Sequence, residues 1–179
     1  MKALPITSTL IACLLSVPVT ASAHDEPSAG KAQAQIAEAR RATAALHDLN
    51  LAISLGYLPL ADKDGLYCID KPGQGAMGIH YLNGGLIDLV VDATAPEALL
   101  YRPLPNGSYK LMGAEYIVPK DAWDAAHPGR PPVLFGQTFH VLAVPNRYNV
   151  PALYTLHLWM WEHNRNGIFE DWNPSVSCP

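Results

Sequence analysis

The sequence predicts a mainly β (α+β) fold, an antiparallel β-barrel or sandwich that carries one long N-terminal helix. Beyond Gly56, proline and glycine separate short runs of β-branched and aromatic residues, which is typical of many short strands joined by turns. Before Gly56, the segment 31–55 is rich in alanine, glutamine, glutamate, arginine and leucine and repeats apolar residues at helical spacing.

The chain opens with the features of a cleavable secretory signal. Lys2 supplies a positive charge, an apolar run covers residues 10–19, and Ala21 and Ala23 form the small-x-small pattern of a cleavage site. The apolar run is shorter than the ~20 residues that a membrane helix needs, and we expect no membrane span. We therefore predict a secreted or periplasmic protein.

The predicted organisation is simple. Residues 1–23 form the signal peptide, residues 24–30 a flexible leader, and residues 31–179 a single β-rich domain with its N-terminal helix. A domain of this size is long enough to bury a core of its own.

Charge and cysteine usage narrow the function classes. The chain has a net charge of −4 at pH 7, and losing Lys2 with the signal makes it more acidic, so we expect no binding to nucleic acid or anionic lipid. Outside the signal, Cys68 and Cys178 form an even pair, which in an oxidising compartment indicates one disulfide. Two free buried thiols are the alternative.

The elements follow in order along the chain. Gly56 ends the predicted helix. The predicted strands cover residues 66–69, 77–82, 87–91, 99–103, 109–118, 133–144 and 152–161. Asn106-Gly107 favours a hairpin turn between two of them, because both residues tolerate positive φ angles. A short helix is expected at 121–126, and residues 164–171 are interpreted as a turn rather than a calcium loop.

Polar residues within apolar strands are the candidates for chemistry. Alternation along 109–118 places Tyr109, Leu111, Gly113, Glu115 and Ile117 on one face, which we take as the core face. Glu115 would then be a buried carboxylate, which is costly without a partner. That partner is a metal, a histidine, a proton, or an arginine in a buried ion pair.

Histidines occupy the middles of other predicted strands. His80 lies in one strand, His157 in another, and His140 in a third. Two imidazoles and one carboxylate form a recurring metal set, suited to zinc with an open position, to iron or to copper. We therefore predict His80, Glu115 and His157 as metal ligands, against the alternative that each histidine is a hydrogen-bonded structural residue.

Four further residues are predicted to support this site or to be alternative ligands. His140, Tyr81 and Tyr116 are expected to orient the ligands by hydrogen bonds. His47, in the predicted helix, would reach the site if that helix closed one end of a barrel, and otherwise lies at an interface.

Several segments together resemble a family of secreted bacterial proteins. The resemblance runs from the helix segment 42–57 through Cys68 and covers nearly all of the chain beyond the signal. Its other segments are residues 75–81, 96–101, 115–116, 156–161, 167–169 and 172–178. This family has no activity to transfer, so the resemblance implies secretion and the extent of the domain. The turn at Asn164-Arg165 differs from the Asn-Pro of the family.

The sequence thus predicts a secreted or periplasmic metal-binding β domain, and an enzyme if the open metal position activates water or dioxygen. The first alternative is a non-catalytic module that binds a small molecule inside the fold. The second is a structural envelope protein whose buried polar residues only satisfy one another.

Overall fold

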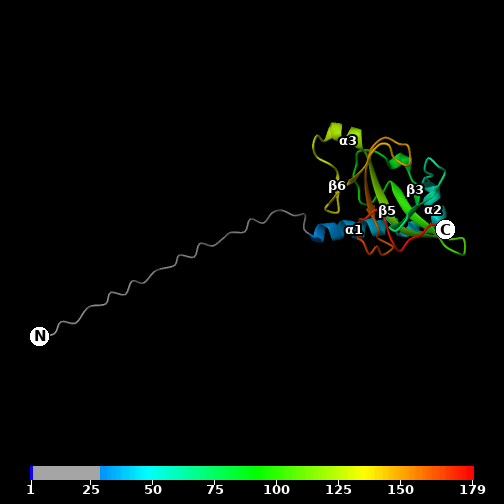
Figure 1. Ribbon diagram of the computed structural model, residues 1–179, viewed down its shortest axis with the longest axis horizontal. Helices are drawn as coiled ribbons and strands as arrows, with labels where there is room; N and C mark the ends of the chain where they lie inside the picture. Colours follow the sequence, from blue (N-terminus) through cyan, green and yellow to red (C-terminus); the bar gives the residue numbers. More distant parts are fainter. Residues whose placement is uncertain (2–28) are drawn as a thin grey trace.

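The computed structural model describes residues 29–179 together with Met1 (Figure 1). The predicted signal peptide 1–23 and most of the predicted leader 24–30 lie outside this range. The main sheet consists of β1 (Leu58–Pro59), β2 (Cys68–Lys71), β3 (Gly75–Leu82), β4 (Ala98–Pro103), β5 (Tyr109–Pro119), β8 (His140–Leu142) and β9 (Leu153–Leu158). With few helices beside it, the fold is of the α+β class.

All strand pairs of the main sheet are antiparallel. The order is β1-β3-β4-β5-β9-β8, and β2 pairs with β3 on the same edge as β1. Within residues 29–179, β8 and the β1/β2 edge do not pair with each other, so the sheet stays open and the predicted closed barrel is wrong. Strands of two and three residues at the edges offer too few hydrogen bonds to close the sheet.

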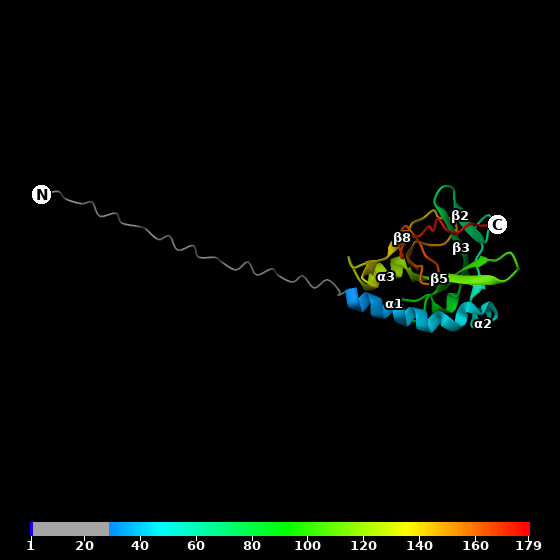
Figure 2. The ribbon, with the colours of Figure 1, turned by 90° about the horizontal axis from the view of Figure 1, so that it is seen from below.

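The predicted single helix 31–55 is also wrong, because the chain divides there. It forms α1 (Ala29–Thr43), a 3-10 turn η1 (Ala44–His47) and α2 (Leu49–Ser54). Asp48 has extended backbone angles, and its carboxylate accepts hydrogen bonds from the backbone N–H groups of Asn50 and Leu51, so it starts a new helix. Figure 2 shows α1 and α2 running along one side of the sheet.

The helices cover one face of the sheet and leave the other face to a second layer of loops. Ile36, Ala39 and Leu46 pack against a large apolar core on the helix side. The sheet residues of that core include Tyr81, Tyr101, Leu111, Tyr116 and Leu156. A smaller cluster lies apart from this core, formed by Ala76, Leu100, Met112, Trp159 and Val176.

A β-bulge in β5 decides which residues face which side. Leu111 pairs with Tyr101 and Gly113 pairs with Leu100, so one step on β4 corresponds to two steps on β5. Met112 is the extra residue. The bulge reverses the alternation, so Leu111 lies in the helix-side core while Glu115 faces the other side. The predicted common face of Tyr109, Leu111 and Glu115 is therefore wrong.

The remaining elements agree in part with expectation. The short helix is α3 (Lys120–Ala126), the 3-10 turn η2 covers Gly84–Leu86, and the predicted strand 87–91 is irregular. The predicted strand 133–144 divides into β6 (Val133–Leu134), β7 (Gln137–Thr138) and β8. It divides because Phe135 and Gly136 both have positive φ and turn the chain into a tight hairpin.

The C-terminal tail after β9 is fixed to the sheet at two points. Cys68 and Cys178 form the predicted disulfide. Asn173, fully buried, pairs with Ala76 through two backbone hydrogen bonds. This irregular segment is thereby held across the open face of the sheet.

Candidate metal centre

Three buried side chains converge on the face of the sheet opposite the helices. His80 comes from β3, Glu115 from β5 and His157 from β9. Glu115 and His157 are direct partners in the β5–β9 ladder, so their side chains leave the sheet on the same face. An open sheet, and not the predicted barrel, thus brings the three predicted ligands together.

The donor atoms of the cluster are close to the spacing that a metal needs. One donor atom from each residue can be chosen so that all three lie within 4.8 Å of one another. His80 Nε2 lies 3.4 Å from Glu115 Oε2, and His157 Nε2 lies 3.9 Å from Glu115 Oε1. A tetrahedral zinc ion with bonds of about 2.0–2.2 Å would hold its ligands roughly 3.3–3.6 Å apart. The His80/Glu115/His157 group could therefore bind a metal after small side-chain movements.

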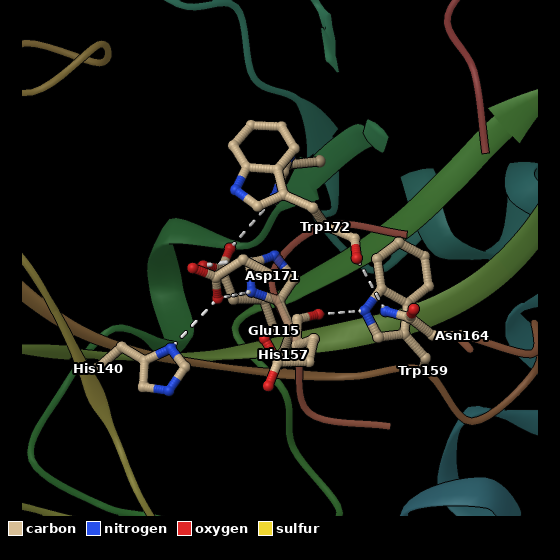
Figure 3. A network of polar contacts seen from close by, with 9 residues as sticks. Glu115, His140, His157, Trp159, Asn164, Asp171 and Trp172 are labelled. Carbon is tan, nitrogen blue, oxygen red and sulfur yellow. Dashed lines mark hydrogen bonds and ion pairs between the residues drawn. The ribbon is translucent and has the colours of Figure 1, made fainter. Parts of the chain in front are cut away.

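Asp171 orients one of the imidazoles, and sequence reasoning missed it. Its carboxylate oxygen lies 3.2 Å from His157 Nδ1 (Figure 3). A proton on Nδ1 leaves Nε2 with a lone pair, and this buried Nε2 has no hydrogen-bond partner among the described residues. A carboxylate that holds a histidine in this tautomer is the usual companion of a histidine metal ligand.

The electrostatics of the cluster follow from burial and from these contacts. Burial, with the charges of His157 and Arg147, lowers the pKa of His80 to about 3, so its contact with Glu115 is made by a neutral imidazole. Burial raises the pKa of Glu115, although His157 partly opposes it. Burial would lower the pKa of His157, but Glu115 and Asp171 outweigh it and raise that pKa.

His140 lies at the margin of the cluster. Its Nδ1 lies 3.3 Å from the same Asp171 oxygen, and about half of its side chain is exposed (Figure 3). His140 thus contacts the residue that orients His157 and does not itself belong to the convergent group.

The other predicted supporting residues lie on the far side of the sheet. Tyr81 packs against Tyr101 in the helix-side core, and the Tyr116 hydroxyl donates to the carbonyl of Ala93. His47 contacts Trp161 edge-on beside the helices. Tyr81 and Tyr116 do not reach the cluster because neighbours in a strand point to opposite faces, and His47 does not reach it because η1 lies on the helix side.

Two cavities meet at the cluster. The larger, about 480 Å³, is bordered by His80 and Glu115, and its walls are mostly apolar. The smaller, about 210 Å³, is bordered by all three cluster residues and by Asp171, His140 and Arg147. The residues that line both cavities are His80, Glu115, Leu142, Tyr148 and Thr155. The candidate ligands thus lie where an apolar space and a more polar one adjoin.

Tyr148 is a second residue that sequence reasoning missed. Its ring packs edge-on against His80 with 6.2 Å between the centroids, and its buried hydroxyl has no hydrogen-bond partner among the described residues. Burial raises its pKa, so the hydroxyl stays protonated. The loop that carries it is closed by Asn146, whose side chain bonds the backbone of Tyr148 and Val150.

Comparisons with known proteins add no identity: no family model, no curated protein and no solved structure matches this chain. The resemblance to a secreted bacterial family therefore stays a prediction from its motifs. Among the helices of residues 29–179, none has the length and apolar character needed to cross a membrane.

Proposed function

We propose that this chain is a secreted or periplasmic metal-binding domain in which His80, Glu115 and His157 hold one divalent ion of zinc, copper or iron. The observation that carries the proposal is the buried convergence of three donor atoms, one of them on an imidazole oriented by Asp171. The disulfide Cys68–Cys178 is compatible with an extracellular or periplasmic location.

The donor set indicates the class of metal and its chemistry. Two imidazoles favour zinc, copper or iron over magnesium and calcium, which prefer oxygen ligands. Three protein ligands leave at least one coordination position for water or a substrate, as in catalytic zinc sites and in iron oxygenases. The proposed activity is therefore metal-dependent, with the ion acting as a Lewis acid or activating a bound small molecule.

A non-catalytic ligand-binding protein is the second candidate, and the cavity of about 480 Å³ favours it. A structural role, which predicts Glu115 closed off by an arginine or by hydroxyls with no cavity beside it, has less support, because Glu115 lines the larger cavity. Arg102 lies beside Glu162, and Arg147 lies beside Asp62.

The test is the metal content of protein purified without an affinity tag. Wild type, His80→Ala and His157→Ala are compared after reconstitution with zinc, copper or iron and gel filtration. His163→Ala is the matched control, because His163 is exposed and lies outside the cluster.

We expect close to one ion per chain in wild type and in the control, and loss of most of it in both cluster variants. Far-ultraviolet circular dichroism verifies that each variant is folded. Folded wild type that retains none of the three metals, or cluster variants that retain as much as wild type, would refute the proposal.

A further inference from the structure

We infer that the ligand of this site is an apolar molecule with one oxygen-donor head group such as a carboxylate, bound with its body in the larger cavity and its head at the metal. The inference rests on the proposed metal function. It adds the chemical class of the ligand and two roles: Tyr148 as a hydrogen-bond donor to the head group, and Ala122 as a residue at the cavity rim.

The body of the ligand is inferred from the walls of the larger cavity. Its apolar walls include Leu60, Leu82, Ile87, Ile117, Leu142 and Val150. Strands β3, β4, β5, β8 and β9 contribute part of this lining, and the start of α3, the segment 148–152 and the residues Leu60 and Ile87 contribute the rest. A space of about 480 Å³ lies in the range of small-molecule sites, and walls of this kind favour an aliphatic or aromatic body.

The head group is inferred from the polar groups beside the cavity. His80 and Glu115 line it and belong to the predicted metal ligands, so an open coordination position of the ion would be reached from this side. Two neutral imidazoles and one carboxylate would leave a divalent ion and its three ligands with one net positive charge, which an anionic oxygen donor neutralises within the coordination sphere; the Asp171 carboxylate lies outside it, against His157. Burying such a head group is costly, and contact with the ion together with a charge-assisted hydrogen bond offsets that cost.

Tyr148 supplies a hydrogen-bond donor for an oxygen of the head group. Its hydroxyl is buried, lacks a partner among residues 29–179, and belongs to a residue that lines both cavities beside His80. An unpaired buried hydroxyl is costly, and a ligand oxygen that accepts its hydrogen bond removes the cost. Tyr148 is therefore assigned as a positioning residue for the ligand and not as a metal ligand.

The experiment uses the full domain loaded with cobalt, whose visible spectrum responds when a ligand enters its coordination sphere. Octanoate and acetate share the head group and differ in the apolar body, so both are titrated into wild type. Ala122→Trp places a large side chain at the rim of the cavity. Ala125→Trp is the matched control, because Ala125 is also exposed on α3 but does not line the cavity.

We expect octanoate to bind at least about tenfold more tightly than acetate, because its additional methylenes leave water. Ala122→Trp should weaken octanoate at least about tenfold and leave acetate unchanged, while Ala125→Trp binds both as wild type does. Tyr148→Phe should weaken both acids by about tenfold, since it removes a hydrogen bond to a charged group, and should keep the cobalt content of wild type.

The outcomes distinguish a failure of the ligand inference from a failure of the proposed metal function. Cobalt uptake with equal affinity for octanoate and acetate, or an Ala122→Trp protein that binds octanoate like wild type, overturns the ligand inference and leaves the metal function standing. Wild-type affinity in Tyr148→Phe overturns the role of Tyr148. Folded protein that takes up neither cobalt nor zinc, copper or iron overturns both the ligand inference and its metal basis.

Discussion

Replacing Asp171 by alanine tests whether the cluster is organised for metal binding. Asp171 Oδ1 lies 3.2 Å from His157 Nδ1, and no other acceptor for that nitrogen is found among residues 29–179. Without the carboxylate, the imidazole can rotate and can place its proton on Nε2, the nitrogen that faces Glu115. Loss of such an outer contact typically weakens metal affinity by about 10–100-fold, or roughly 1.4–2.8 kcal/mol.

The assay is a competition titration of zinc or cobalt against a chromogenic chelator. Asp171→Asn should weaken binding less than Asp171→Ala, because an amide oxygen still accepts the hydrogen bond but carries no charge. His140→Ala is the control: His140 touches the same carboxylate oxygen and lies outside the cluster, so affinity should stay within about twofold. An Asp171→Ala protein with wild-type affinity would show that the contact does not organise the site.

Three predictions concern stability. Glu97 is buried, and burial raises its pKa to about 7 from the usual 4.5, so folding takes up a proton between these values and stability falls as the pH rises through this window, by up to about 3 kcal/mol. Denaturant titrations should therefore find Glu97→Gln more stable than wild type at pH 8 and equal to it below pH 4.5; equality at both pH values contradicts the assignment. In Gly113→Ala the new Cβ would clash with the carbonyl oxygen of Leu158, which forces β5 and β9 apart, whereas a Cβ at Gly84 meets nothing within 4 Å. The first variant should lose about 1–3 kcal/mol of unfolding free energy and the second less than about 0.5 kcal/mol; similar losses would speak against the close approach. Serine at both Cys68 and Cys178 opens a loop with a sequence separation of 110, which should lower the unfolding free energy by roughly 2–5 kcal/mol in denaturant, and an unchanged midpoint would show that the tail is held without the bond.

The three cluster residues could be found from the sequence because each one is a polar residue within an apolar strand. A buried carboxylate or imidazole at such a position needs a partner, and that requirement holds before the strand order is known. Periodicity cannot predict which strands pair, because the strand order depends on contacts between residues far apart in the chain. The open sheet places β3, β5 and β9 near enough for His80, Glu115 and His157 to meet.

The β5 bulge shows where alternation fails. Regular alternation would place Tyr109, Leu111 and Glu115 on one face, but the bulge places Tyr109 and Leu111 in the helix-side core and Glu115 on the other face. The only sequence signal for the bulge in this segment is Gly113, which follows the extra residue. Its missing side chain permits the close approach of β5 to the backbone of Leu158. Tyr81 and Tyr116 were a different case: each follows a predicted ligand directly, so alternation alone places it on the opposite face.

Asp171 and Tyr148 could not be found by pattern because both lie in irregular segments. Residues 164–171 resemble an ordinary turn, and the segment 146–150 has no periodicity to interpret. The position of Tyr148 depends on tertiary contacts of its neighbour Arg147. The backbone carbonyl of Arg147 accepts a hydrogen bond from Lys63, and its side chain lies 3.3 Å from Asp62. Polar residues of irregular loops thus complete a site whose ligands come from strands.

The attachment of the C-terminal tail links the disulfide to the proposed metal site. Asp171 lies between Ile168, whose carbonyl accepts the backbone N–H of Trp159, and Asn173, which pairs with Ala76 of β3. Cys178 then joins the tail to Cys68 of β2, the strand beside β3. A carboxylate can orient an imidazole only if its own position is fixed, and here the segment that carries it lacks the support of a regular strand or helix. The disulfide and the Asn173 pairing supply that support, so the orientation of His157 depends on the attachment of the tail.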